Sequence, residues 1–130
     1  MSAPLAKLGD TVRGMDTHIV LVPAPGGPVP TPYELPFSGP LTRGCCPTVL
    51  TGGRPVATLG SVAVNTPVHI PPVGTFQVPP DDLGTVDSGS ATVFVGGRPA
   101  VRHGDSATTC NDPVRPRTSL VVATGTVFVG

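Results

Sequence analysis

The sequence predicts an all-β protein made of short strands and tight turns. It contains 17 glycines and 18 prolines among 130 residues. Each proline inside a helix costs about 3 kcal/mol, so long helices are excluded. Only 12% of the residues are charged and the mean hydropathy is positive, whereas disordered chains are highly charged and poor in aliphatic residues. We therefore expect residues 1–130 to form one domain of β-hairpins joined by proline- and glycine-rich loops.

An internal repeat organises the chain. Residues 48–61 (TVLTGGRPVATLGS) and 92–105 (TVFVGGRPAVRHGD) are identical at 7 of 14 positions, and TVFVG recurs at 126–130. The segment AKLGD at 6–10 resembles the second half of the same unit. The chain thus starts with the second half of a unit and ends with the first half of one. Joined through the termini, these pieces make three units, which predicts a small cone with approximate threefold symmetry.

Each unit has the features of a β-hairpin. Thr-Val-Phe-Val is typical of a strand, and the Gly-Gly pair that follows supplies the positive φ angles of a tight turn. The proline of Arg-Pro falls at the start of the return strand, where a missing N–H is tolerated. A single hairpin is marginally stable in water, so the three hairpins must share a core.

Long segments rich in proline and glycine connect the units. They cover residues 19–44, 62–86 and 106–119. Proline makes such segments stiff and nearly extended, and loops of this length are usually either functional or disordered. Their stiffness and their equivalent places in the three units favour a function, with the loops converging at an apex.

Metal-ligating residues recur in these loops. His18, His69 and Cys110 each lie six to nine residues after the glycine of their unit's turn. Under threefold symmetry the three side chains would meet near the axis, and His103 could supply a fourth donor. Three imidazoles and one thiolate form a closed tetrahedral set, which is typical of structural zinc sites. We therefore predict one structural Zn²⁺ per chain at the apex.

Other interpretations of these residues stay open at this stage. The histidines could be unrelated surface residues, the cysteine a buried free thiol, and His103 the cap of a strand end. Cys45, Cys46 or a water molecule could take the fourth position, although packing is the simpler role for the adjacent cysteines.

The strands also carry continuous apolar runs. A strand with only one buried face would alternate apolar and polar residues, so we expect the core to cover one face and a partner protein the other. The residues concerned are Val93, Phe94, Val95, Val127, Phe128 and Val129.

Several functions are excluded or disfavoured by what the sequence lacks. Eight basic residues balance eight acidic ones, and Lys7 is the only lysine, so a nucleic-acid partner is not expected. No nucleotide-binding or hydrolase motif is present. A catalytic zinc needs an open position and a nearby base, and Glu34 is the only glutamate. We therefore expect that the protein is not an enzyme, and a zinc-dependent hydrolase is the less favoured alternative.

The motifs together resemble the PAAR-repeat family. GGRPVA at 52–57 and GGRPAVRHGD at 96–105 are similar to its Pro-Ala-Ala-Arg repeats, and GCCPTVLTGG at 44–53 and GTVFVG at 125–130 to its strand motif. PAPGGPVPTPY at 23–33 resembles an insertion of PAAR-like proteins. Neither copy spells Pro-Ala-Ala-Arg, and the segment before His69 lacks the cysteine that is often found there, so the fourth ligand stays open.

The resemblance implies a fold and a function. PAAR proteins are β-rich cones with a zinc near the apex, and they cap the trimeric VgrG-like spike of type VI secretion systems and phage-tail-like particles. We accordingly expect one monomer on a trimer, docked through the apolar runs, with transient contact between its point and a target membrane. Tethering of effector cargo to the spike is the alternative role.

The same resemblance sets expectations for where the protein is made and used. Residues 1–10 lack the apolar region of a secretory signal, which predicts synthesis in the cytoplasm. Assembly at the tip of an injection particle would follow, from where the protein can leave the cell or enter the target.

Overall fold

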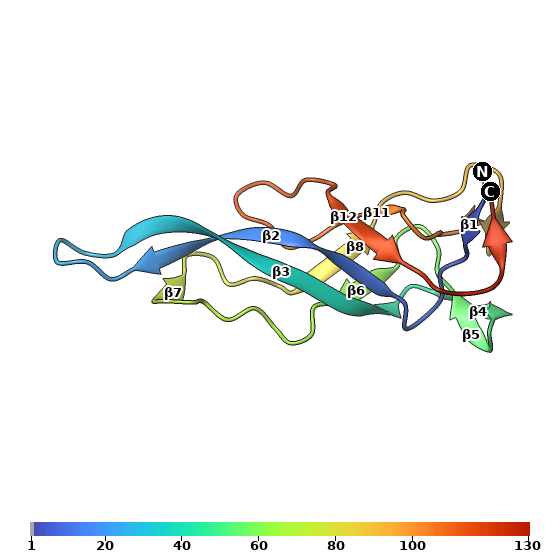
Figure 1. Ribbon diagram of the computed structural model, residues 1–130, viewed down its shortest axis with the longest axis horizontal. Coiled ribbons are helices and arrows are strands. Elements are labelled where there is room, and N and C mark those ends of the chain that lie inside the picture. The colour runs from blue at the N-terminus through green and yellow to red at the C-terminus, as the bar shows by residue number, and fades with distance from the viewer. Residues whose placement is uncertain (1) are drawn as a thin grey trace.

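The computed structural model describes residues 2–130, and this range contains strands and turns but no α-helix. No helix in it could cross a membrane. The molecule is elongated, with both termini at one end and a long hairpin at the other (Figure 1). The strands are β1 (Ala3–Pro4), β2 (Thr11–Val22), β3 (Val29–Arg43), β4 (Cys46–Thr51), β5 (Arg54–Val56), β6 (Val62–Val64), β7 (Thr75–Phe76), β8 (Leu83–Val86), β9 (Phe94–Val95), β10 (Arg98–Pro99), β11 (Ser106–Thr108), β12 (Ser119–Val122) and β13 (Phe128–Val129). The predicted all-β class is confirmed.

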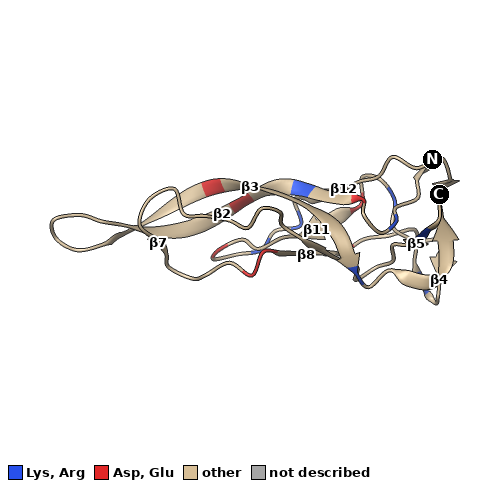
Figure 2. Cartoon of the chain, turned by 90° about the horizontal axis from the view of Figure 1, so that it is seen from below, with Lys and Arg blue, Asp and Glu red and all other residues tan. Residues whose placement is uncertain are grey.

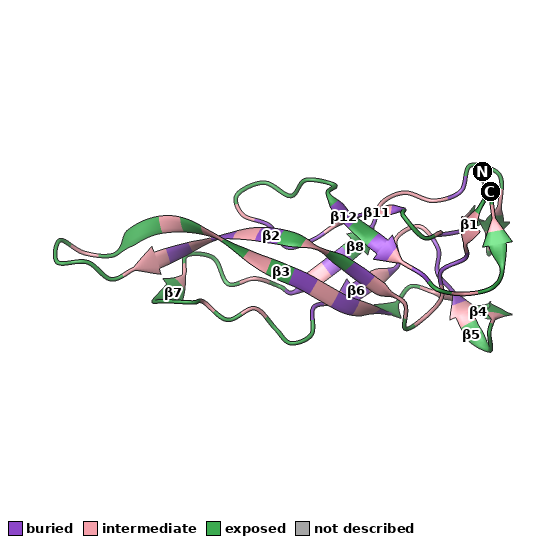
Figure 3. Cartoon of the chain, in the orientation of Figure 1, coloured by how far each residue is buried: buried purple, intermediate pink, exposed green. Residues whose placement is uncertain are grey.

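Six strands form a closed antiparallel sheet in the middle of the molecule. Its order is β12-β11-β8-β6-β3-β2, and β12 pairs with β2 to close it, with Val121 opposite Val12. β7 extends the sheet beside the far end of β2. Buried residues lie along these strands (Figure 3), and Phe37 has the largest of the fully buried side chains. The buried cluster includes Val12, Phe37, Leu41, Ala63, Val86, Ala107 and Val121.

Three short hairpins form the end of the molecule that holds both termini, here called the base (Figure 1). Two of them, β4–β5 and β9–β10, turn at Gly52-Gly53 and Gly96-Gly97, and all four glycines have positive φ. The third hairpin pairs β1 with β13, so that the two ends of the chain complete it, with Ala3 opposite Val129. Joining the first and last segments into a third unit was therefore the correct interpretation of the repeat.

A ring of backbone hydrogen bonds marks the threefold axis. Ala6, Ala57 and Val101 occupy equivalent positions in the three units, and all three are buried. Ala57 N–H donates to Ala6 O (2.9 Å), Ala6 N–H to Val101 O (2.8 Å) and Val101 N–H to Ala57 O (3.1 Å). Each unit thus donates to one neighbour and accepts from the other, which holds the base hairpins around one centre.

The turn that follows this ring is also repeated three times. Backbone N–H groups donate to the side chain three residues later in each unit: Lys7 to Asp10, Thr58 to Ser61 and Arg102 to Asp105. In each turn the later N–H returns a bond to the first carbonyl. The side chain satisfies a backbone donor that would otherwise lack a partner, so aspartate and serine fit the same position.

The segment at 19–44 differs from the expected loop. Most of it belongs to β2 and β3, which pair continuously from Thr11↔Pro40 to Val22↔Val29. Ser38 is an even-numbered residue of β3. Its N–H points away from β2 and donates to Asn65 Oδ1. Prolines at other even positions of β3 likewise leave the β2–β3 ladder intact, because their missing N–H would point outward. Proline content alone therefore gave the wrong prediction for this segment.

Candidate metal centre

The alternation of β2 places two polar side chains inside the closed sheet. Asp16 and His18 are separated by one residue, so they point to the same face as the buried Val12 and Val20. Asp16 is 0% exposed and His18 is 1% exposed. Fully buried charged or titratable groups are uncommon unless they have partners, which makes this end of the core a candidate site.

Two loops from the other units bring in the remaining donors. His69 lies between β6 and β7, and its backbone N–H donates to Asp82 Oδ1 at 2.9 Å. Cys110 follows β11, and its neighbour Asn111 accepts a hydrogen bond from Thr17 N–H of β2 at 2.7 Å. One ligand atom from each of Asp16, His18, His69 and Cys110 lies within 4.8 Å of the others.

Asp16 has several hydrogen-bond partners at the centre of this group. His69 Nε2 is 2.9 Å from its Oδ2, Cys110 Sγ donates to Oδ2 at 3.3 Å, and Thr109 Oγ1 and Asn111 Nδ2 donate to Oδ1. Burial alone would raise the pKa of Asp16. The hydrogen bonds from His69, Thr109 and Cys110 outweigh burial and hold the pKa below its ordinary value. Asp16 is therefore a carboxylate in the core.

His18 is oriented by a second carboxylate. Its Nδ1 is 3.1 Å from Asp112 Oδ2, while its Nε2 faces Cys110 Sγ at 3.9 Å. The His18 ring also packs edge-on against His69, with the centroids 4.8 Å apart. A carboxylate on one ring nitrogen leaves the other free to bind a metal, which is a frequent arrangement around zinc.

Cys110 is protonated in the absence of a metal. Burial, followed by the nearby charge of Asp16, raises the pKa of its thiol to about 12. A metal ion would bind the thiolate and so displace this proton.

The four side chains fit a zinc ion. Two imidazole nitrogens, one sulfur and one carboxylate oxygen are all ligands that Zn²⁺ accepts, and four protein donors complete a tetrahedron. All four donor side chains are at least 97% buried. With all four donors bound, a zinc ion would have no position left for water or substrate, as in structural rather than catalytic sites.

A family model for the PAAR motif matches residues 23–116, which is more than half of the chain. The chain belongs to the PAAR-motif family. This family comprises structural spike-tip proteins of contractile injection systems. A search of curated proteins found no match.

His103 lies apart from the donor group in this PAAR protein. His103 is exposed, and its Nδ1 accepts a hydrogen bond from Ala123 N–H at 3.1 Å. Its backbone N–H is used between units, donating to Pro4 O. The structure therefore brings together His18, His69 and Cys110 of the four predicted ligands, and leaves His103 next to the base.

The adjacent cysteines lie outside the donor group. Cys45 is partly buried and packs against the core, and burial raises the pKa of its thiol. Cys46 begins β4, and its Sγ lies 3.4 Å from Thr48 Oγ1. Neither belongs to the donor group that the structure assembles.

The sequence prediction missed Asp16. The signal was present, because Asp16 and His18 stand two residues apart in a segment that forms a strand. The repeat register did not reveal it, because Pro67 and Thr108 stand at the equivalent position in the other units, two residues before His69 and Cys110. The alternation of β2 places the carboxylate beside the histidine.

The predicted partner-facing residues divide between two faces of the base hairpins. Val93, Val95 and Val129 pack against an inner cluster of Leu5, Val56 and Ala100. Phe94 and Phe128 are each 58% exposed, and Val127 is 47% exposed. The repeat aligns a third residue, Leu50, with these phenylalanines, and it is 59% exposed.

Proposed function

We propose that this PAAR protein caps the end of a trimeric spike, with its base against the spike and its hairpin end pointing away. The observation that carries the proposal is the threefold base. Leu50, Phe94 and Phe128 hold equivalent places in three hairpins, and all three side chains are exposed. One chain with this arrangement can offer the same apolar contact to each of three identical spike subunits.

We further propose that one Zn²⁺, held by Asp16, His18, His69 and Cys110, stabilises the part of the molecule beyond the base. The bound ion would supply coordination bonds that link β2 to the loops after β6 and after β11. Structural zinc sites contribute on the order of 10 kcal/mol of apparent binding free energy in small domains. Cross-linking of this kind would resist deformation when the tip is driven through an envelope.

The docking proposal is tested by co-purification with the trimeric spike protein of the same injection system. A triple variant carrying Leu50→Asp, Phe94→Asp and Phe128→Asp should lose the spike, because charged groups would have to be buried in the interface. A matched control is Ile70→Asp, an exposed apolar residue on the loop that carries His69. Spike binding by the triple variant at the wild-type level would contradict the proposal.

A further inference from the structure

The charged side chains of this neutral chain are distributed unevenly along the molecule. Two of the eight acidic residues, Asp10 and Asp105, lie in the base hairpins or the segments next to them. Five of the eight basic residues lie in the same segments, namely Lys7, Arg43, Arg54, Arg98 and Arg102. Figure 2 shows most blue segments towards the end that holds the termini and most red segments farther along the molecule. The base therefore carries a net positive charge although the chain as a whole carries none.

Both acidic residues of the base are already bound within the chain. Asp10 accepts a hydrogen bond from Lys7 N–H, and its carboxylate lies 3.2 Å from the Lys7 ammonium. Asp105 accepts a hydrogen bond from Arg102 N–H and pairs with the Arg102 guanidinium at 2.9 Å. The two acidic side chains are only 10% and 6% exposed. These carboxylates neutralise Lys7 and Arg102, so the charge that remains at the base is positive.

Three arginines of the base have no acidic partner within the chain. The ion pairs of Lys and Arg side chains within residues 2–130 do not include Arg43, Arg54 or Arg98. All three residues are exposed. Arg98 Nη1 donates a long hydrogen bond of 3.4 Å to the uncharged acceptor Leu59 O. The positive charges of these three arginines, here called the free arginines, are therefore available to a partner.

Two of the free arginines belong to the hairpins that carry the exposed apolar side chains of the base. Arg54 begins β5, the return strand of the hairpin with Leu50, and Arg98 begins β10, the return strand of the hairpin with Phe94. An apolar centre with arginine around it is typical of a protein–protein interface. The phosphate backbone of nucleic acid binds cations without apolar contacts, and a flat lipid surface has no threefold symmetry to match. The base therefore fits a protein partner best.

A hollow between two of the hairpins can receive an acidic side chain. It has a volume of about 320 Å³, and Cys46 of β4 and Gly96 of the β9–β10 turn lie on its wall. Arg98 is the only charged residue among those that line it. The planar guanidinium group matches a carboxylate with two parallel N–H donors. A carboxylate in this hollow would be partly shielded from water, which strengthens its attraction to Arg98.

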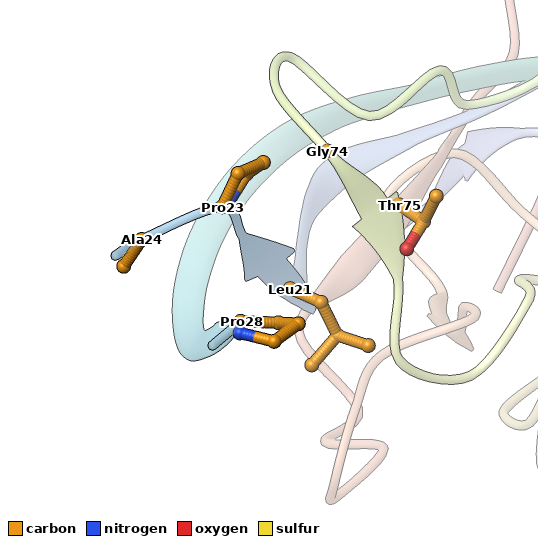
Figure 4. A pocket seen from close by; sticks show the side chains of 6 residues that line it. All are labelled: Leu21, Pro23, Ala24, Pro28, Gly74 and Thr75. Atoms are coloured by element: carbon orange, nitrogen blue, oxygen red, sulfur yellow. The ribbon is translucent and has the colours of Figure 1, made fainter. Parts of the chain in front are cut away.

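The end opposite the base contributes no charge. Residues 19–33 and 66–80 contain no Asp, Glu, Lys or Arg. A hollow of about 280 Å³ beside the long hairpin is lined by uncharged residues, and Figure 4 shows the Leu21 and Pro28 side chains next to each other there. The other six acidic and three basic residues lie between the two ends. The positive pole of the molecule is therefore the base, and the excess of acidic residues lies in the middle.

We propose that the end of the spike that meets the base is acidic, and that Arg43, Arg54 and Arg98 attract its carboxylates. The proposal rests on the proposed function, because it specifies the partner of the same docking surface. Opposite charges on two docking surfaces raise the rate of association and orient the approach. The acidic middle of this chain would repel the same spike end. The charge distribution thus directs the base, and not the sides of the molecule, towards the spike.

The first test removes the free arginines together. Arg43→Gln, Arg54→Gln and Arg98→Gln are combined in one variant, and its association with the purified trimeric spike is measured by stopped-flow kinetics at low and high salt. We expect the association rate constant at low salt to fall at least about tenfold. The wild-type rate should fall as salt is added, because salt screens exposed charges. The variant should respond much less to salt.

A matched control removes the same total charge elsewhere. Arg13→Gln, Arg115→Gln and Arg117→Gln are combined, and these three residues are also exposed but lie outside the base. This variant should not associate more slowly than the wild type, because the positive charge of the base is unchanged. Equal losses of rate in the two triple variants would contradict the proposal, since only the total charge would then matter.

Replacement of the free arginines by lysine separates charge from structure. Combined Arg43→Lys, Arg54→Lys and Arg98→Lys should keep most of the wild-type association rate, because lysine keeps the positive charge. A loss as large as in the glutamine variant would contradict the proposal. Wild-type binding at a rate independent of salt would overturn the acidic partner alone and leave docking supported. Absence of spike binding by the wild type would overturn the docking itself, and this inference with it.

Discussion

The base and the opposite end of the molecule treat the threefold repeat differently. At the base, three hairpins, a ring of three backbone hydrogen bonds and three turns repeat the same geometry. Beyond the ring the units diverge: β2 and β3 are 12 and 15 residues long, while β6 and β11 have three residues each. Symmetry is therefore kept where a trimeric partner would be met and is lost where side chains from the three units form one asymmetric site.

Loss of the Cys110 thiol, which lies in the asymmetric site, should have the largest effect on stability. Cys110→Ser removes a buried ligand, and we expect the bound metal to be lost. The free energy of unfolding should fall by several kcal/mol, because metal binding and folding are coupled. Denaturant titration with metal analysis measures both quantities. Cys46→Ser, near the base, is the matched control and should change neither, and equal effects of the two variants would count against the donor group.

Single substitutions at the base sharpen the comparison, because symmetry predicts equal effects. Leu50→Asp, Phe94→Asp and Phe128→Asp should each weaken spike binding by about 2 kcal/mol, which is roughly thirtyfold. Surface plasmon resonance against the immobilised trimer gives the three dissociation constants. A large effect at one position and none at the others would show that the base does not use its symmetry in docking.

Acid should weaken metal binding without affecting the base. The pKa of the Cys110 thiol is raised to about 12, so at neutral pH the metal must displace its proton. Apparent metal affinity should therefore rise with pH and fall about tenfold for each unit of acidification. Chelator competition at two pH values about one unit apart measures this slope. An affinity independent of pH would mean that Cys110 is not a ligand.

The three equivalent turns at the base should contribute unequally to the free energy of unfolding. Asp105 Oδ2 accepts hydrogen bonds from Arg102 N–H and from the Arg102 side chain, whereas Ser61 Oγ accepts one from Thr58 N–H. Bonds to a charged group are stronger, so Asp105→Ala should cost about 2 kcal/mol and Ser61→Ala about 1 kcal/mol. Urea unfolding of both variants tests the ranking, and a larger loss for Ser61→Ala would reverse it.

The sequence predicted the base well because its geometry is carried by motifs that recur along the chain. The Gly-Gly pairs specify the turns, and the repeat spacing specifies which segments are equivalent, including the pairing of β1 with β13. The grouping of His18, His69 and Cys110 also followed from the repeat register. These features depend on motifs that recur within the chain.

The features that the sequence did not predict depend on neighbouring segments of the folded chain. Pro30 and Pro32 are compatible with a long strand only because β2 lies on the other side of β3. His103 has the chemistry of a ligand, but its position before the turn glycine places it next to the base, where Ala123 N–H donates to its ring. Leu50 aligns with Phe94 and Phe128 in the repeat, but its exposure depends on the fold of the β4–β5 hairpin.

Native mass spectrometry of the chain purified with zinc present tests the shared metal site most directly. We predict one zinc per chain in the wild-type protein and in His103→Ala, and none in His18→Ala, His69→Ala or Cys110→Ala. This pattern would mean that the three diverging units share one ion. A wild-type chain without metal, or loss of zinc in His103→Ala with retention in His69→Ala, would contradict it.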